Sequence, residues 1–240
     1  MFLGKCDAVH IRTNFLEWCT PRLVPSSTNA EDNVFSMSIA TEKPALEAAS
    51  AEPAHEHYAR LLEGMARAVA AKGYADTTIA DIVREAAVSR RTFYEHFTTK
   101  SECLIALYEA ASKLALRAVS EAFDPAQPWH AQVERAITAY FDYLAQDPPL
   151  LRTLFVEILG LGMPGLAARR RVNGEIAGFI QAAINGGPAA HLTSEMAMTV
   201  VGGINELVLQ AIEQDRVGEL GQLVPPATRL VRAVAAESAR

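Results

Sequence analysis

The sequence lacks most of the features that identify an enzyme, a membrane protein or a secreted domain. Its 240 residues include 3 cysteines and 7% aromatic residues, and no C-x-x-C pair or even set of cysteines indicates a metal site or a disulfide framework. No apolar run reaches the roughly 20 residues that span a bilayer. The first residues lack the basic and apolar segments of a signal peptide. We therefore expect a cytoplasmic protein with no membrane partner.

Catalytic motifs are missing as well. The histidines are scattered, and no Ser/His/Asp set or metal-ligand spacing is present. The motif G-x-G-x-x-G at residues 160–165 follows a helical pattern instead of a strand, and Pro164 interrupts it. It therefore indicates an interhelical loop and not a dinucleotide site. We expect no cofactor, no metal and no enzyme activity. An enzyme that uses a helical cavity is the alternative, and metal bound to the purified protein would reopen it.

Helical periodicity dominates the part of the sequence that is patterned. Apolar residues recur at helical spacing from about Pro53 onward, and no alternating strand pattern is present. The sequence predicts an all-α fold. The expected helices cover residues 53–73, 77–86, 89–97, 100–123, 129–146, 148–160, 164–185, 193–215 and 219–237.

Residues 1–52 show no sustained period and include a Pro- and Ser-containing stretch and a Pro-, Ala- and Glu-rich run. We expect them to be a largely disordered N-terminal extension. Met37 is an alternative start of the protein, which would leave residues 1–36 untranslated.

The most informative segment is residues 77–100, TTIADIVREAAVSRRTFYEHFTTK. It predicts two short helices joined by a tight turn, which is the layout of a helix-turn-helix. Thr78 and Asp81 resemble a capping box with Asp in place of the usual Glu. The residues expected to brace the second helix from inside are Ile82, Val83, Val88, Phe93 and Phe97.

The outward residues of this segment suit double-stranded DNA. Arginine can bond guanine edges or phosphates, and hydroxyl groups suit phosphates. Backbone N–H groups at helix N-termini also bind phosphate. The candidate DNA-binding residues are Thr78, Ser89, Arg90, Arg91, Thr92, Tyr94, His96 and Lys100.

The net charge of −6 is unfavourable for binding DNA, but it is not evenly spread. Residues 53–123 carry as many basic as acidic side chains, and the acidic excess lies on either side. Residues 88–100 hold three basic side chains against Glu95 alone. Because phosphate attraction depends on the local charge, this segment can still face DNA.

Residues 57–104 resemble the DNA-binding domain of the TetR family of transcriptional regulators. The residues that carry the resemblance are Gly73-Tyr74, Thr77-Thr78-Ile79, Ile82, Ala86-Ala87-Val88-Ser89, Thr92-Phe93-Tyr94-x-His96-Phe97 and Lys100-x-x-x-Leu104. The resemblance implies that the third helix reads the major groove. It also implies that Thr92, Tyr94 and Lys100 contact the DNA backbone and that Arg90 and Arg91 can touch bases.

Two positions depart from the family pattern. Ala87 stands in the turn where the family commonly has Gly, and Ala fits there only at negative φ or with a strain of about 1 kcal/mol. Arg91 stands where Gly, Lys or Pro is frequent, which suggests an individual operator sequence. The alternative for the whole segment is a helical bundle whose Arg and Tyr side chains are merely solvated.

The resemblance divides the chain into a helix-turn-helix domain at 53–100, a connecting helix at 101–123 and an all-helical effector-binding and dimerisation domain at 124–240. Isolated polar or aromatic groups in apolar helices are candidate pocket residues. They are Tyr140, Tyr143, Phe155, Glu157, Asn173 and Asn205, with Met163, Arg170, Phe179 and Glu206 as further candidates. A structural or surface position is the alternative for each. Arg169-Arg170-Arg171 either steers an acidic effector or forms a solvated face.

The last two predicted helices have broad apolar faces, which is typical of a four-helix dimer bundle. The expected interface residues are Val201, Gly202, Ile204, Leu207, Val208, Leu230 and Val234. Burial of these faces within the monomer is the alternative.

The leading hypothesis is a homodimeric repressor that a small-molecule effector releases from a palindromic operator. The same fold acting as an activator, or answering to a protein partner, is the alternative. The operator, the effector and the regulated genes are not encoded in any recognisable motif.

Overall fold

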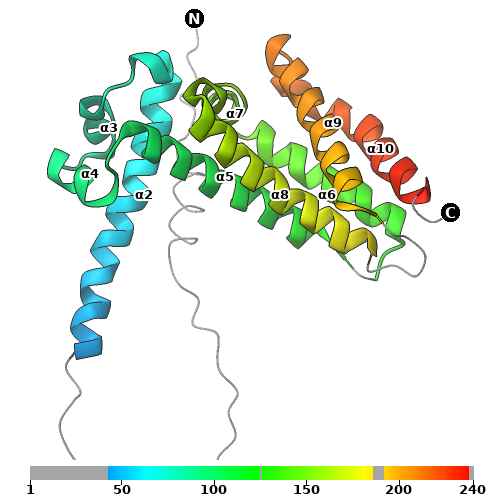
Figure 1. Ribbon diagram of the computed structural model, residues 1–240, viewed down its shortest axis with the longest axis horizontal. Helices are drawn as coiled ribbons and strands as arrows, with labels where there is room; N and C mark the ends of the chain where they lie inside the picture. The colour runs from blue at the N-terminus through cyan, green and yellow to red at the C-terminus, as the bar shows by residue number, and fades with distance from the viewer. Residues whose placement is uncertain (1–42, 125, 186–191, 238–240) are drawn as a thin grey trace, which may run out of the picture.

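The structure is a computed structural model that describes residues 43–124, 126–185 and 192–237 (Figure 1). All of its regular elements in these ranges are helical, as the sequence predicts. They are α2 (Lys43–Asp76), α3 (Ile79–Ala86), α4 (Arg90–His96), α5 (Lys100–Ala122), α6 (Trp129–Ala145), α7 (Pro148–Phe155), the 3-10 helix η1 (Glu157–Leu161), α8 (Met163–Asn185), α9 (Ser194–Glu213), the 3-10 helix η2 (Val217–Leu223) and α10 (Val224–Glu237). Among these helices, none combines the length and apolar character that a membrane span requires.

Two differences from the predicted elements have a physical reason. α2 begins at Lys43 and continues through the predicted boundary at Pro53; its first part is rich in Ala and Glu, which favour helix without giving an apolar stripe. The predicted helix 219–237 is divided into η2 and α10. Pro225 and Pro226 have no N–H to continue the hydrogen bonds of the preceding turn, and proline is tolerated at the start of a helix. Of residues 1–52, which are expected to be disordered, 1–42 lie outside the described residues, whereas 43–52 belong to α2.

The predicted stop of the first helix at Gly73 is confirmed. Gly73 has φ 78° and ψ 162°, a left-handed conformation that a residue with a Cβ avoids. The chain turns there, and the buried Thr77 closes the turn by donating a hydrogen bond to the Gly73 carbonyl at 2.7 Å.

α3 approaches the backbone of α2 very closely at Gly64. A Cβ atom at this position would lie 2.7 Å from the carbonyl oxygen of Ile82 and 2.8 Å from the backbone nitrogen of Ala86. Only glycine allows this separation, so Gly64 fixes how α3 lies on α2.

Two clusters of buried apolar side chains hold the chain together. The first runs from Leu61 through Phe93 and Phe97 to α5, and continues through α7 and η1 to Val172 of α8. The second lies among α6, α8, α9 and α10. Cys103 belongs to the first cluster, and burial raises the pKa of its thiol; the prediction that it is a packing residue is confirmed.

α5 connects the helix-turn-helix to the rest of the protein. Its first turns pack against α2, and its later turns pack against α6 and α8. In Figure 1, α2, α3 and α4 lie at one end, and α6, α8, α9 and α10 extend away along α5. The first cluster crosses the boundary predicted at residues 100 and 101, so the helix-turn-helix shares its core with the body.

The close approach at Gly64 predicts an unequal effect of two Gly→Ala substitutions. Gly64→Ala is expected to lower the free energy of unfolding by about 1–3 kcal/mol, because its Cβ overlaps the α3 backbone. Gly174→Ala is the matched control, since nothing lies within 4 Å of its added Cβ. It is expected to raise stability by up to about 1 kcal/mol through helix propensity. Urea denaturation measures both, and equal effects would contradict the assigned role of Gly64.

Candidate DNA-reading surface and effector cavity

The start of α3 carries the predicted capping box. The Thr78 hydroxyl accepts a hydrogen bond from the Asp81 backbone N–H at 3.3 Å, and the Asp81 carboxylate accepts one from the Thr78 backbone N–H at 2.9 Å. Lys72 donates to the same carboxylate at 2.5 Å. This bond, followed by those from Thr78, holds the pKa of Asp81 far below its ordinary value. The stabilisation is therefore complete above the unfolded-state pKa of about 4 and is lost as pH falls toward the folded-state pKa.

The turn between α3 and α4 has a left-handed residue without glycine. Ala87 has φ 51° and ψ 45°, so of the two options that the sequence left open, the protein accepts the strain. Arg60 of α2 supports the turn: its Nε donates to the Ala86 carbonyl at 3.0 Å and its Nη2 to the Ala87 carbonyl at 2.5 Å. Arg67 donates to the Glu85 carbonyl.

Sequence reasoning missed Arg60 and Arg67. The two arginines are seven residues apart, so they lie on one face of α2. The spacing of seven residues is visible in the sequence, but it does not show that the C-terminal end of α3 lies beside the two arginines.

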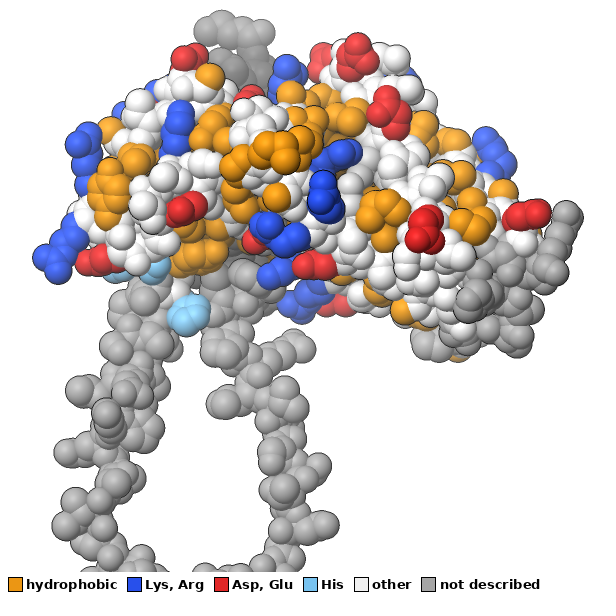
Figure 2. All heavy atoms as spheres, in the orientation of Figure 1, with side chains coloured by type: hydrophobic (Ala, Val, Ile, Leu, Met, Phe, Trp, Pro, Cys, Tyr) orange, Lys and Arg blue, Asp and Glu red, His pale blue; other side chains and the backbone are white. Residues whose placement is uncertain are grey.

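The outward face of α4 is open to solvent. Arg90 and Arg91 are exposed, and the Arg91 side chain is 90% exposed with one ion pair, to Glu95 at 3.1 Å. Tyr94 is 60% exposed, and its ring meets the buried Phe93 edge-on at 5.6 Å between centroids. Figure 2 shows blue basic side chains along the free edge over α3 and α4. The predicted brace and the predicted reading face thus lie on opposite sides of one helix.

Three further candidates lie at the margins of this face. The Ser89 hydroxyl caps α4 by accepting a hydrogen bond from the Thr92 backbone N–H at 3.0 Å, and the two hydroxyl groups are 2.9 Å apart. His96 is half-buried and lies edge-on to Tyr58 at 5.9 Å between centroids. Burial, and then the nearby His57, lower the pKa of His96. Its imidazole is therefore neutral at neutral pH and adds no charge to the face.

Lys100 has a different environment from the other candidates. Its ammonium donates to the carbonyls of Tyr74 at 3.0 Å, Ala75 at 3.2 Å and Thr77 at 2.8 Å. It also lies 4.4 Å from the centroid of the Tyr74 ring. An ammonium has three N–H donors, and the turn that follows the kink at Gly73, at the end of α2, uses all of them. The geometry therefore favours a role in fixing this turn over direct contact with DNA.

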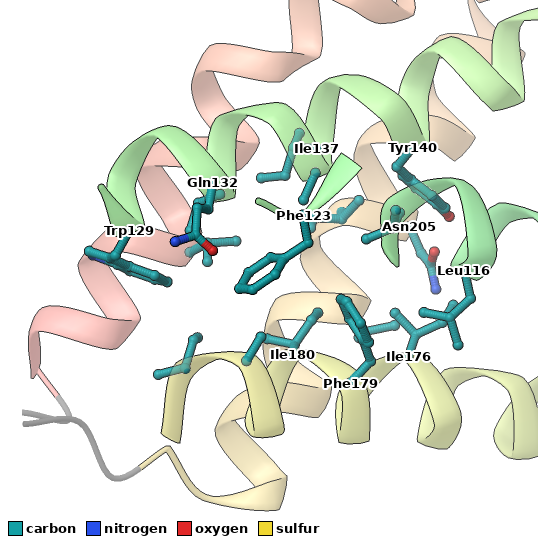
Figure 3. Close-up of a pocket in the computed structure, with 18 residues that line it drawn as sticks. Leu116, Phe123, Trp129, Gln132, Ile137, Tyr140, Ile176, Phe179, Ile180 and Asn205 are labelled. Carbon is teal, nitrogen blue, oxygen red and sulfur yellow. The ribbon is translucent and has the colours of Figure 1, made fainter. Parts of the chain in front are cut away.

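A cavity lies inside the body of the protein, between α5, α6, α8, α9 and α10 (Figure 3). We name it the apolar chamber; it has about 840 Å³ of space free of atoms, part of it open to solvent. Its lining residues are Leu116, Val119, Phe123, Trp129, Gln132, Val133, Ala136, Ile137, Tyr140, Ile176, Phe179, Ile180, Ala183, Ile184, Val201, Ile204, Asn205 and Val231. Its lining of apolar and aromatic side chains with a few polar groups is typical of a ligand site.

A second cavity, which we name the polar chamber, adjoins the first and has about 470 Å³ of free space. The two share Tyr140, Ile176 and Asn205. The other residues of the polar chamber are Tyr108, Ala111, Ser112, Ala115, Tyr143, Leu144, Leu154, Phe155, Arg169, Val172 and Asn173.

Most of the predicted pocket residues line these chambers. Tyr140 and Asn205 line both, and Tyr143, Phe155 and Asn173 line the polar chamber. Whether they bind a ligand stays a prediction. Among the further candidates, Phe179 lines the apolar chamber, whereas Met163, Arg170 and Glu206 are exposed and line neither.

Glu157 is the exception among the main pocket candidates. It lies where the body meets the helix-turn-helix, and its carboxylate accepts a hydrogen bond from the Tyr74 backbone N–H at 3.4 Å. It lines neither chamber, so these two cavities do not support its prediction as a pocket residue. The reason is that the chain changes from α7 to η1 after Phe155, which turns residue 157 away from the cavity.

The polar groups of the cavity are few. Gln132 donates through its amide nitrogen to the Gln127 carbonyl at 2.6 Å, and its buried amide oxygen has no hydrogen-bond partner in the described residues. Burial raises the pKa of Tyr108 and of Tyr143 to about 12, so both hydroxyls keep their protons at neutral pH. Arg169 is the one charged residue among those that line the chambers in the described ranges. Sequence reasoning considered it only as part of a triple-arginine run.

The residues predicted for a dimer interface differ in how deeply they are buried in the monomer. Val201, Ile204 and Val208 are buried in the second cluster of the monomer, so for these three the alternative was correct and the interface prediction is wrong. Gly202 is exposed, and Leu207, Leu230 and Val234 are half-buried. The broad apolar face of α9 is explained by the packing of α8, η2 and α10 around it.

A family model matches the helix-turn-helix alone, whereas solved structures match most of the chain. A sequence model described as "Bacterial regulatory proteins, tetR family" matches residues 61–107. No curated protein matches the chain. Among solved structures, the fatty acid degradation regulator FadR from Bacillus halodurans is 19% identical with a TM-score of 0.62, over 72% of this chain and 93% of that chain.

Two other structures share the fold. FadR from Bacillus subtilis, solved in complex with stearoyl-CoA, is 19% identical with a TM-score of 0.60, over 72% of this chain and 97% of that chain. The regulator TylP from Streptomyces fradiae is 22% identical with a TM-score of 0.58, over 76% of this chain and 88% of that chain.

The left-handed conformation of Ala87 predicts that glycine stabilises the turn. Ala87→Gly is expected to raise the free energy of unfolding by roughly 0.5–1 kcal/mol, since relief of the αL strain exceeds the added entropy of the unfolded chain. Ala71→Gly, at an exposed helical position of α2, is the control and should lower it by about 1 kcal/mol. Chemical denaturation distinguishes the two, and destabilisation by both would show that the turn is not strained.

Proposed function

The chain carries the N-terminal domain of the TetR family of regulators on an all-helical body of the same fold, and on that premise we propose that it is a homodimeric transcriptional repressor. It binds a palindromic operator through α4 and is released when a small-molecule effector enters the chambers. It acts on DNA in the cytoplasm.

The single observation that carries the DNA-binding proposal is the two-sided α4. Phe93 and Phe97 are buried in the core that α4 shares with α2 and α3, whereas Arg90, Arg91 and Tyr94 are exposed to solvent in the part of the chain that the structure describes. A helix braced on one side and polar on the other fits a major groove. Thr78, Ser89 and Thr92 border the same face and suit phosphate contacts.

The effector proposal is supported by how the chambers adjoin the helix-turn-helix. Phe155 lines the polar chamber, and two residues later Glu157 accepts the hydrogen bond from Tyr74. Tyr74 in turn lies under Lys100, the first residue of α5. A ligand that moves Phe155 would therefore shift the contact that sets the angle of the helix-turn-helix.

Dimerisation is proposed from the requirements of operator binding and from the remaining surface of α9 and α10. Two reading helices must lie about 34–36 Å apart to enter successive major grooves. Gly202 is exposed on α9, and Leu207 and Leu230 are half-buried, so parts of both helices are accessible to a second copy.

A salt-dependent band shift with DNA from around the protein's own gene tests the reading helix. Arg91→Ala and Tyr94→Phe together are expected to weaken specific binding by about 10- to 100-fold, since a bidentate base contact contributes about 1–3 kcal/mol. Wild-type binding should weaken steeply with salt.

Arg170→Ala is the control for this experiment, because Arg170 is exposed on α8 and away from α4. It should bind as the wild type does. All variants should keep the wild-type melting temperature, since surface substitutions of this kind change stability little. Specific binding that is unaffected in the double variant would overturn the roles of both residues.

The junction at Glu157 gives a prediction that needs no effector. Glu157→Ala is expected to speed amide hydrogen exchange of Tyr74 by about fivefold, because the amide loses a hydrogen bond worth about 1 kcal/mol. The operator affinity should change as well, since the helix-turn-helix loses a contact that orients it. Exchange followed by NMR or mass spectrometry measures the first effect.

Glu175→Ala is the matched control, since Glu175 is an exposed glutamate of α8. It should leave both the exchange of Tyr74 and the operator affinity unchanged. If Glu157→Ala also leaves both unchanged, the junction does not couple the chambers to the helix-turn-helix.

A further inference from the structure

The two chambers differ in the chemistry of the side chains that line them. The walls of the apolar chamber come almost entirely from hydrocarbon and aromatic side chains, with amide groups only at Gln132 and Asn205 and one phenol at Tyr140. The polar chamber brings together the side chains of Tyr108, Tyr143, Asn173 and Arg169. Because the chambers share Tyr140, Ile176 and Asn205, one elongated molecule can occupy both.

Arg169 sets the sign of charge that the polar chamber accepts. It is half-buried, and no carboxylate of the described residues lies within ion-pair distance of it. Its neighbour Arg171, in contrast, is paired with Glu109. A partly desolvated cation without an anion is unfavourable, and an anionic group of a ligand would compensate it with charge-assisted hydrogen bonds.

The polar groups around Arg169 can complete an anion site. The Tyr143 hydroxyl donates its only proton to the Ala111 carbonyl at 3.2 Å, so Tyr143 shapes the chamber wall and is not a donor to the anion. The Asn205 amide donates to the Asn173 side-chain oxygen at 3.2 Å. This bond fixes Asn173 with its own amide nitrogen still able to donate. The Tyr108 phenol keeps its proton at neutral pH and is a further donor.

We propose that the ligand of this cavity is an amphipathic acid, with an anionic head group paired with Arg169 in the polar chamber and a hydrocarbon body in the apolar chamber. This inference rests on the proposed effector-binding function and names the chemical class of its ligand. A neutral apolar compound would leave Arg169 uncompensated, and a polar anion without a hydrocarbon body would leave the apolar walls unfilled.

Figure 3 shows the arrangement of the apolar end. Phe179, Ile180 and Ile176 project from α8 toward Phe123, and Trp129 and Gln132 lie at the end remote from Tyr140 and Asn205. A chain that extends from Arg169 past Ile176 therefore runs toward Trp129. This direction makes the fluorescence of Trp129 a local reporter of how far a chain reaches.

Titration calorimetry on the full chain, with monomeric probes below their micelle concentrations, tests the proposal. The probes are octanoate, dodecanoate, hexadecanoate, dodecanol and dodecanoyl-CoA. Dodecanoate is expected to bind about 10- to 100-fold more tightly than dodecanol, the range of a charge-assisted contact. Affinity should rise with chain length until the apolar chamber is filled.

Arg169→Gln is expected to reduce the affinity for dodecanoate to that for dodecanol and to leave the affinity for dodecanol unchanged. Arg170→Gln is the matched control, because it removes the same charge from the adjacent, exposed position and should have no effect. Arg169→Lys keeps the charge and should retain affinity within about tenfold of the wild type. Ala136→Trp fills part of the apolar chamber, so it should shift the preference toward octanoate.

The probes distinguish two sources of the anionic head group, a free carboxylic acid and a coenzyme A thioester. Tighter binding of dodecanoate than of dodecanoyl-CoA identifies a free acid, and the reverse identifies a thioester, provided that Arg169→Gln weakens the tighter probe. Equal binding of dodecanoate and dodecanol that is indifferent to Arg169→Gln would overturn the proposal, as would the absence of binding by every probe.

Band shifts on the same samples keep this inference separate from the proposed function. Release of operator DNA by the tighter probe supports both. Probe binding with unchanged operator affinity leaves the ligand class standing and overturns its role as effector. Specific operator binding without any probe binding overturns the ligand class and leaves the DNA-binding proposal intact.

Discussion

The packing of α3 on α2 at Gly64 is the contact on which the rest of the structure depends. Because no Cβ separates the two backbones, the end of α3 comes within reach of Arg60, whose guanidinium holds the carbonyls of the turn. The turn then directs α4 so that Phe93 enters the core and the opposite face meets solvent. A wider separation of α2 and α3 would also move Arg60 away from the turn, so that the strained Ala87 would lose the hydrogen bonds that support it. The orientation of α4 thus depends on Gly64, a residue of α2 that lies against the α3 backbone.

The core that fixes α4 also forms part of the chamber wall. Phe93 and Phe97 belong to the same buried cluster as Leu154 and Val172, and these last two line the polar chamber. Close-packed interiors transmit displacement because they have few voids to absorb it. In the proposed function, a molecule that fills the chamber would act on the packing that holds α4, in addition to the junction between Glu157 and Tyr74. The two routes have a common origin, since α5 contributes to both.

The arginines show how one residue type serves three purposes in a single chain. Arg60 donates hydrogen bonds to backbone carbonyls inside the helix-turn-helix. Arg91 projects into solvent with one weak ion pair. Arg169 lines a chamber and has no acidic partner among the described residues. Surface pairs contribute little to stability, so the exposed arginines are available for binding. Their positions, and not their number, reconcile a net charge of −6 with a DNA-binding face.

The helices, the helix-turn-helix with its capping box and the resemblance of this segment to one family of regulators could all be predicted from the sequence, because they depend on short-range periodicity and on fixed local spacings. The sequence also indicated six residues that line the chambers, since isolated polar or aromatic groups in apolar helices stand out locally. Only the tertiary structure shows that Glu157 faces the helix-turn-helix and that Lys100 donates to three backbone carbonyls of a turn. The same holds for the burial of Val201, Ile204 and Val208 in the monomer. Each of these outcomes depends on which element lies opposite a given face, and that is a long-range property. The distinction of Arg169 from Arg170 and Arg171 has the same cause, because three adjacent arginines differ only in what surrounds them after folding.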